Sequence, residues 1–479
     1  MILRVINHPY EFDMKNLCIT FFPHEKIRLE GEEDPVVVTT RRETDGSFFV
    51  SAKVYDVYRE TTAKPEPADE EHLVLSVTLY RLLSGILGFA PPWGVLYGVR
   101  PAKLMHRLCA QMGDDAAVAH FQTAFLTQKS KAELAHEVML HENRSIARSG
   151  PKSFSLYVSI PFCPTRCAYC SFVSHSIEKT HKLMTPYVDL LLRELEETAK
   201  YAKELGLELA TVYFGGGTPT TLSAQDLGRI FSTIEQNFDL SHLMEYTVEA
   251  GRPDTVTRER LDVIRAAGVQ RISINPQSFN DKVLEAIGRR HTAQQTLDAF
   301  ALARDCGFDH INMDFIAGLP EDDLPSFQRS IQTALDLQAE SITVHTLALK
   351  TSAYMVTREQ TFDLKDRLTV SNMVDYAGQT LHGAGYYPYY MYRQSKSLGN
   401  LENVGWCKPG YDCLYNVYMM DETHTVLAVG AGAVTKLRGQ NSGMIERIYN
   451  YKYPYEYIRD FDTLLERKKR IPGFYAEYD

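Results

Sequence analysis

The stretch SLYVSIPFCPTRCAYC, residues 155–170, joins an apolar run to three closely spaced cysteines. The apolar run is typical of a buried strand. Cys163, Cys167 and Cys170 follow it at a C-x3-C-x2-C spacing, in a loop that contains two prolines and a small alanine. A loop of this kind, placed directly after a strand, can wrap around a bound group.

The cysteine spacing indicates a metal site. Eight cysteines scattered over 479 residues are too few for a disulfide framework, and only these three form a tight cluster. Thiolates are the soft ligands of iron–sulfur clusters, most of which take four. Three ligands would leave one iron of a [4Fe-4S] cluster open to a substrate or cosubstrate. Buried apolar cysteines and a zinc knuckle are the alternatives, although structural zinc usually pairs C-x2-C with a distant second pair.

Beyond the loop, apolar runs alternate with amphipathic segments long enough to cross over a sheet. The apolar runs are residues 155–162, 210–216, 244–251, 270–277, 310–318 and 341–349. Such runs are typical of buried parallel strands. Six units predict an α/β fold, an open partial (β/α)6 barrel of the TIM type, with two further units conceivable only in the C-terminal region.

Composition changes predict three domains. Residues 1–60 contain short alternating segments that predict strands, and helical segments follow up to about residue 147. We therefore expect an α+β accessory domain over residues 1–150, the barrel over 151–364, and an α+β domain that covers the substrate over 365–479. The last region begins with tyrosine-rich sequence that favours irregular or short antiparallel structure, and it ends in one helix.

Charge and hydropathy argue against two classes of partner, nucleic acids and membranes. The formal net charge of −10 argues against a nucleic-acid partner, because such binding relies on clustered Lys and Arg. The N-terminus lacks the features of a signal peptide, and no apolar run is long enough to span a membrane. We therefore expect a cytoplasmic protein that acts on a small molecule, with no nucleic-acid or membrane partner.

A second motif ends the second predicted strand. Gly215, Gly216 and Gly217 let backbone approach a ligand with no side chain in the way, although a glycine run is also typical of a tight turn. Together with the cysteine loop, this strand end resembles the radical S-adenosylmethionine (SAM) superfamily. The resemblance implies that the open iron binds SAM and that the cofactor carries the radical chemistry.

Five segments resemble oxygen-independent coproporphyrinogen III oxidases and their relatives in order and spacing. They are LYVSIPFCPTRCAYCSF (156–172), YFGGGTPTTL (213–222), TVEAGRPDT (247–255), NPQSFNDKVLEAIGRRHT (275–292) and NMDFIAGLPED (312–322). The stretch YMYRQSKSLGNLENVGW (390–406) and the long N-terminal region resemble the HemZ-like branch. The resemblance implies oxidative decarboxylation of two propionates of coproporphyrinogen III to vinyl groups. It also implies a low-potential electron donor such as flavodoxin or ferredoxin.

The resemblance implies roles for individual residues. Cys163, Cys167 and Cys170 would hold the cluster, and these cysteines together with Tyr157 are the expected catalytic residues. The positions implied to contact the cluster-bound SAM are Tyr157, Tyr169, Gly216, Glu249 and Val434. A second SAM molecule is implied at Gly217, Thr218, Gln277, Arg289, Asp314 and Ala348. The Arg289 fork suits a carboxylate, and Asp314 suits an amine or a ribose hydroxyl.

The tyrosine-rich stretch near residue 390 has two interpretations. Tyr386, Tyr387, Tyr389, Tyr390, Tyr392 and Arg393 either line a porphyrinogen pocket or form a packed core. In the pocket, aromatic faces would meet pyrroles and the arginine would meet propionates.

Two positions depart from the related proteins. Phe172 stands where the oxidases best known for this reaction carry a further cysteine, and Tyr415 stands where related haem chaperones carry a haem-binding histidine. The first departure weakens the transfer of the exact activity, and the second argues against a chaperone. Three functions stay open: propionate decarboxylation, haem trafficking, and radical opening of the haem ring.

Overall fold

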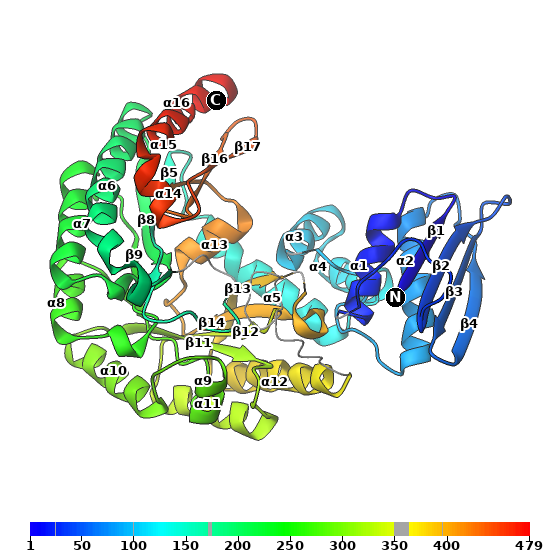
Figure 1. Cartoon of the computed structure of the whole chain (residues 1–479). Coiled ribbons are helices and arrows are strands. Elements are labelled where there is room, and N and C mark those ends of the chain that lie inside the picture. Colours follow the sequence, from blue (N-terminus) through cyan, green and yellow to red (C-terminus); the bar gives the residue numbers. More distant parts are fainter. Residues whose placement is uncertain (24, 99, 171–174, 349–363, 395) are drawn as a thin grey trace.

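A curved sheet of parallel strands forms the centre of the molecule, with helices along its outside (Figure 1). The computed structural model describes residues 1–23, 25–98, 100–170, 175–348, 364–394 and 396–479. The central parallel strands are, in spatial order, β12 (Ser341–Thr346), β11 (His310–Ala317), β10 (Arg271–Ser273), β9 (Glu245–Glu249), β8 (Glu208–Gly216) and β5 (Ser153–Ile160). They coincide with the six predicted apolar runs, and the partial (β/α)6 barrel is confirmed.

One or two helices follow each of these strands in the chain, and those between two parallel strands form the crossovers. These helices are α6 (Ile177–Glu204), α7 (Ala224–Asn237), α8 (Arg258–Ala266), α9 (Asp281–Ala286), α10 (Ala293–Asp305), α11 (Leu324–Asp336) and α12 (Leu364–Gly383). Side-chain caps set where several of them begin: Ser223 accepts from the Asp226 amide at α7, and Thr292 forms a capping box at α10. Among the described helices, none is both long and apolar enough to cross a membrane.

C-terminal strands extend both edges of the parallel sheet. β14 (Glu402–Cys407) lies antiparallel beside β12, and β13 (Tyr387–Arg393) lies antiparallel beside β14. At the other edge, β15 (Thr425–Val429) runs parallel beside β5, followed by antiparallel β16 (Val434–Arg438) and β17 (Ile445–Tyr449). Within the described residues, β13 and β17 do not pair with each other, so the sheet stays open.

The sequence did not predict two features of this C-terminal region. The strand β15 is a seventh parallel strand, and no strand–helix repeat in the sequence predicts it. The expected single closing helix is three short helices: α14 (Pro454–Arg459), α15 (Phe461–Lys468) and α16 (Arg470–Tyr478). A further helix, α13 (Leu414–Asp421), lies between β14 and β15 in sequence.

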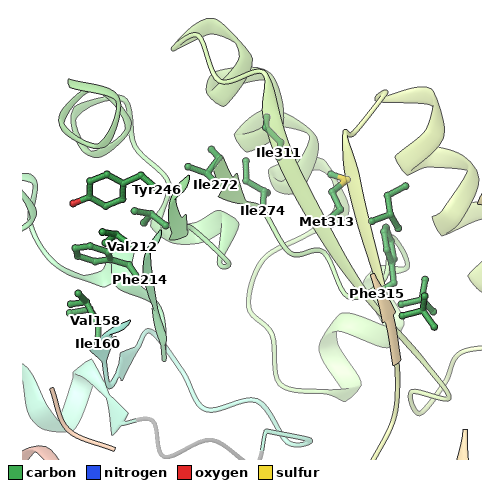
Figure 2. Close-up of a cluster of buried hydrophobic side chains, with 14 of the residues drawn as sticks. Val158, Ile160, Val212, Phe214, Tyr246, Ile272, Ile274, Ile311, Met313 and Phe315 are labelled. Atoms are coloured by element: carbon green, nitrogen blue, oxygen red, sulfur yellow. The ribbon is translucent and has the colours of Figure 1, made fainter. Parts of the chain in front are cut away.

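Alternation along the strands gives the sheet two different faces. Apolar side chains on one face pack in the large core, and Figure 2 shows those of β5, β8, β9, β10 and β11 along consecutive strands. The intervening positions on the other, concave face are polar or aromatic. They include Tyr157, Tyr213, Glu249, Asp314 and His345. The alternation therefore separates a stabilising face from a face able to do chemistry.

The N-terminal region contains its own sheet. Its strands are β1 (Ile2–Ile6), β2 (Val36–Arg42), β3 (Phe48–Val54) and β4 (Val57–Ala63), and the helices α1 (Glu11–Phe21) and α2 (Glu71–Leu87) pack with it in a separate core. In Figure 1 this unit stands apart from the curved sheet. The expectation of strands alone over residues 1–60 missed α1.

Three helices lie between the N-terminal unit and the curved sheet (Figure 1). They are α3 (Pro101–Met112), α4 (Asp114–Thr123) and α5 (Lys129–Ile146). Their buried side chains belong to the same core as the parallel strands. Residues 1–150 therefore contribute to two hydrophobic cores, with the change near Trp93, which packs in the larger one.

Candidate active site

The three cysteines lie in the loop after β5, at the carboxyl end of the parallel strands. Cys163 belongs to the two-residue strand β6 (Phe162–Cys163), which pairs with β7 (His175–Ser176). Cys167 is buried, whereas Cys163 and Cys170 are half-buried. The Cys170 amide donates to the Cys167 carbonyl at 3.2 Å, which turns the loop back on itself. Carboxyl ends of parallel strands are where barrel active sites form.

The glycine-rich end of β8 packs directly on this loop. The amide of Gly217 donates to the Ile160 carbonyl at 2.7 Å, and the amide of Thr218 donates to the Phe162 carbonyl at the same distance. The Thr218 hydroxyl also donates to Cys163 Sγ at 3.4 Å. A Cβ at Gly217 would lie 2.6 Å from the Phe162 carbonyl and 3.0 Å from Cys163 Sγ. Only glycine allows this approach.

The donor set fits an iron–sulfur cluster. Three thiols from one loop stand over a backbone cradle that a single Cβ would fill. Cys407 and Cys413 lie elsewhere: Cys407 pairs in register with Ser341, the first residue of β12, and the Cys413 thiol donates to Glu245, the first residue of β9. Both therefore belong to the amino-terminal end of the strands, away from the loop.

Three tyrosines stack on the concave face beneath the loop. Tyr157 on β5 faces Tyr213 on β8 in register, with ring centroids 6.2 Å apart. Tyr415 from α13 stacks on both, 5.9 Å from Tyr157 and 4.4 Å from Tyr213. Burial, followed by the charge of Glu249, raises the pKa of Tyr157, so its hydroxyl stays protonated. Tyr415 therefore covers this part of the concave face.

Glu249 ends β9 beside this stack. Its carboxylate accepts from the Tyr213 hydroxyl at 2.6 Å. Burial raises the pKa of Glu249 to about 7, and the charge of Asp314 adds to the rise while Tyr213 opposes it. Two neighbouring hydroxyls on the same face, of Thr247 and Ser273, are buried without a hydrogen-bond partner among the described residues. The wall around Glu249 therefore suits a polar ligand.

Asp314 lies two strands away on β11. Asn312 donates to one of its oxygens at 2.7 Å, and His345 lies 3.8 Å from the other. Although burial alone would raise the pKa of Asp314, His345 and Asn312 hold it below its usual value. This carboxylate is therefore charged at neutral pH and offers a second anionic position on the concave face.

Gln277 and Arg289 follow β10. The Gln277 amide donates to the Asp314 carbonyl at 2.9 Å, and the residue has a left-handed φ of 67°. Such a backbone conformation is strained for a residue other than glycine and occurs often at functional sites. Arg289 donates to the Asn275 carbonyl at 2.5 Å and to the Tyr169 hydroxyl at 3.2 Å. It therefore connects the post-β10 loop to the cysteine loop.

Ala348 and Val434 lie at opposite sides of the parallel strands. Ala348 follows β12 and forms a bridge with Ser397, whereas Val434 begins β16 on the side of β5. The loop before Val434 is held against β5, because the Ser159 hydroxyl donates to the Ala431 carbonyl at 2.8 Å. All the predicted site positions thus lie along one end of the strands. Phe172 lies outside the described residues.

Arg393 does not line the concave face. Its guanidinium lies over the Trp93 ring and donates to the carbonyls of Leu96 and Asn400. The expectation that it meets propionates is therefore wrong, because backbone carbonyls already use its donors. Tyr390 and Tyr392 stack on each other, and the Tyr392 hydroxyl lies 3.2 Å from His345 Nδ1. These two rings, in contrast, stand beside the polar face.

Sequence reasoning missed three contacts. The first involves Tyr213, which the sequence could have revealed: alternation along β8 and β9 puts Tyr213 and Glu249 on the same face of the sheet. The position of Tyr415 against Tyr157 joins residues far apart in the chain, and nothing local announces it. Arg252, in the loop after β9, contacts Cys167 Sγ at 3.7 Å, and a lone arginine in a loop carries no signal of such a role.

The comparisons with known proteins agree with this geometry. Residues 157–334 match the Radical SAM superfamily. The structure resembles coproporphyrinogen III oxidase HemN from Escherichia coli, with a TM-score of 0.51 and 22% identity over 68% of this chain and 72% of that chain. The fold and the cysteine loop thus define a radical SAM protein, a class that uses a [4Fe-4S] cluster and SAM.

Three relatives narrow the class. The chain is 34% identical to the oxygen-independent coproporphyrinogen-III oxidase-like protein HemZ of Bacillus subtilis, over 95% of this chain and 94% of HemZ. It is 31% identical to the heme chaperone HemW of the same organism, over 64% of this chain and 79% of HemW. It is 29% identical to anaerobilin synthase of Escherichia coli O157:H7, over 49% of this chain and 51% of that protein. The chain therefore belongs to the oxygen-independent coproporphyrinogen-III oxidase-like family of radical SAM enzymes.

Proposed function

We propose that this enzyme oxidatively decarboxylates two propionates of coproporphyrinogen III to vinyl groups, giving protoporphyrinogen IX. The observation that carries the proposal is similarity over nearly the whole chain to a protein named as oxygen-independent coproporphyrinogen-III oxidase-like. The matches to the chaperone and to anaerobilin synthase leave a third or more of the chain uncovered. The proposal therefore rests on the N- and C-terminal regions as well as on the barrel.

In the proposed reaction, each converted propionate loses a hydrogen atom, CO2 and one electron. A hydrogen atom leaves the β-carbon of a propionate, and the bond between the adjacent carbon and the carboxylate then breaks. One electron of that bond completes the vinyl double bond, and the other passes to a one-electron acceptor as CO2 leaves. When bound, the reduced cluster and SAM supply the 5′-deoxyadenosyl radical that takes the hydrogen atom.

The residues of the chain would bind and orient these groups. Cys163, Cys167 and Cys170 would ligate the cluster in the cradle at Gly217. The Glu249 carboxylate would accept hydrogen bonds from the cluster-bound SAM and face its positive sulfonium. The other positions proposed for this molecule are Tyr157, Tyr169, Gly216 and Val434.

A second SAM would lie along the neighbouring loops. Its proposed contacts are Gly217, Thr218, Gln277, Arg289, Asp314 and Ala348. The charged Asp314 supports this placement, because an anion at that point suits an amine or hydroxyl donor. Arg289 keeps one edge on Tyr169 and Asn275. Its Nε, buried without a partner among the described residues, is the donor left for a carboxylate.

The proposal also includes the domain organisation, the electron donor and the cellular location. We retain the division into an accessory domain (1–150), a barrel (151–364) and a substrate-covering domain (365–479), with Tyr390 and Tyr392 beside the tetrapyrrole. The electron donor would be a flavodoxin or ferredoxin, and the enzyme would act in the cytoplasm without a nucleic-acid or membrane partner.

Two alternatives make different use of a tetrapyrrole. A haem chaperone binds haem through iron, and Tyr415 is buried and stacked on Tyr157 and Tyr213, which speaks against an iron ligand at that position. Radical opening of the haem ring requires haem as substrate and yields an open-chain bilin. Neither alternative predicts consumption of coproporphyrinogen III.

Product analysis separates the three functions. Reconstituted enzyme is incubated anoxically with SAM, a reductant and either coproporphyrinogen III or haem. The proposal predicts the monovinyl intermediate and protoporphyrinogen IX from the first substrate. Stoichiometric haem binding without these products, or bilins formed from haem, would replace it. Cys167→Ala, which removes a proposed cluster ligand, is the control for chemistry that depends on the cluster.

A further inference from the structure

Arg252 occupies an unusual position behind the cysteine loop. It lies in the loop after β9, and its side chain is only 4% exposed. The Asp254 carboxylate accepts from two nitrogens along one edge of the guanidinium, with Nε to Oδ1 at 2.9 Å and Nη2 to Oδ2 at 2.7 Å. A bidentate pair of this kind fixes the orientation of the guanidinium plane.

The remaining nitrogen points at the cysteine loop. Arg252 Nη1 donates to the Thr165 hydroxyl at 3.1 Å and to Cys167 Sγ at 3.7 Å. Thr165 and Cys167 are two residues apart in the loop, so one nitrogen reaches both a side-chain hydroxyl of the loop and its buried sulfur. The role proposed above for SAM binding does not use Arg252.

The titratable and charged groups around Arg252 are His291, Arg289 and Asp254. His291 is buried beside it, and burial together with the charges of Arg289 and Arg252 lowers the pKa of His291 to about 3, so the ring is neutral. Arg289 is a second cation that faces Cys167; its Nη1 donates to the Asn275 carbonyl and its Nη2 to the Tyr169 hydroxyl, and its Nε is buried without a partner among the described residues. The Asp254 carboxylate is the anion that compensates Arg252.

We propose that Arg252, oriented by Asp254, hydrogen-bonds the Cys167 thiolate of the bound cluster and raises the reduction potential of that cluster. A donor to a ligating sulfur withdraws negative charge, and this favours the reduced, more negative state. Arg252 is thus a positioning residue, which acts through Cys167 and raises the reduction potential of the cluster enough for a biological reductant to reduce it. This inference rests on the proposed cluster, but it does not depend on which tetrapyrrole is the substrate.

Potentiometric titration of the cluster, followed by electron paramagnetic resonance without substrate, tests the proposal. Arg252→Gln is expected to keep the iron content of the wild type and to shift the midpoint to a more negative potential. Arg252→Lys and Asp254→Asn are expected to give smaller shifts in the same direction, because each keeps a cation but loses the fixed fork. Arg229→Gln, on the outer helix α7, is the matched control and should titrate like the wild type.

The outcomes separate this proposal from the proposed function. An unchanged midpoint in Arg252→Gln with a full cluster overturns the role of Arg252. Loss of the cluster in all three variants, with Arg229→Gln intact, also overturns it, because Arg252 would then only hold the loop. Absence of vinyl products from the wild type refutes the decarboxylation and leaves the titration unaffected.

Discussion

At the scale of single residues, the Glu249 carboxyl combines burial with a pKa near neutrality. If its ionised form binds the sulfonium of SAM, affinity follows its ionised fraction. With a pKa of about 7, that fraction and the affinity for SAM rise about tenfold between about pH 6 and about pH 8. Isothermal titration of SAM into the reconstituted enzyme across this range measures the effect.

The variant Glu249→Gln isolates this carboxyl. It is expected to bind SAM weakly, with affinity that no longer changes over the same pH range. Glu259→Gln on α8, at the start of an exposed helix turn, serves as the control and should keep the wild-type profile. A pH dependence that survives in Glu249→Gln would assign the titration to another group.

Gly217 offers a steric test of the cluster cradle. In Gly217→Ala the new Cβ would lie 2.6 Å from the Phe162 carbonyl and 3.0 Å from Cys163 Sγ, closer than packed atoms allow. We expect loss of most of the iron and of the brown absorbance after reconstitution. Gly228→Ala, whose Cβ would meet only Val263 at 3.7 Å, should retain both. Equal iron in the two variants would contradict the cradle.

Local spacing explains which site residues the sequence reveals. Cys163, Cys167 and Cys170 lie in one loop, so their spacing alone indicates a shared ligand. Arg252 and Tyr415 reach the same site from other parts of the chain. Their contacts arise only when strands that are distant in sequence become neighbours, and no periodic pattern encodes such a contact.

At the scale of elements, strand alternation carries most of the predictable information. The apolar runs identify β5 and β8 to β12, because every second residue of these strands packs in the large core. Two elements are less predictable. The strand β15 pairs in parallel with β5, although no strand–helix repeat in the sequence predicts it. The helix α1 lies within a region whose composition favours strands. In both places tertiary packing decides the structure over local preference.

A buried ion pair joins the crossover helix α6 to α15 and to the loop before β16. Lys468 and Glu194 are both fully buried, with Nζ 2.7 Å from Oε1. Glu194 also accepts from the Gly430 amide at 2.7 Å. Because Lys468→Met leaves that carboxylate without its cation, we expect a loss of about 3–5 kcal/mol in the free energy of unfolding, measured by urea titration.

The neighbouring residue gives a matched control for this pair. Lys469, just after the end of α15, is 62% exposed and pairs with the exposed Glu466 of that helix, so Lys469→Met should change stability little. The double variant Glu194→Gln/Lys468→Met should recover part of the loss, because the uncompensated charge is gone. A single Lys468→Met variant as stable as Lys469→Met would show that the pair contributes nothing.

At the scale of the whole molecule, the C-terminal region extends the open sheet at both edges. β13 and β14 continue the sheet beyond β12, and β15 to β17 continue it beyond β5. The proposed contacts of the cluster-bound SAM and of the second SAM consequently draw on strands from the middle and the end of the chain. A protein that keeps only the central barrel would lack Val434 and the tyrosines beside His345.

The most direct test of the account follows the hydrogen atom itself. Coproporphyrinogen III deuterated at the β-carbons of its propionates is incubated anoxically with the reconstituted enzyme, SAM and a reductant. The account predicts 5′-deoxyadenosine that carries deuterium, together with vinyl products that have lost one deuterium from each converted propionate. Undeuterated 5′-deoxyadenosine, or deuterated 5′-deoxyadenosine without any loss of CO2, would contradict it.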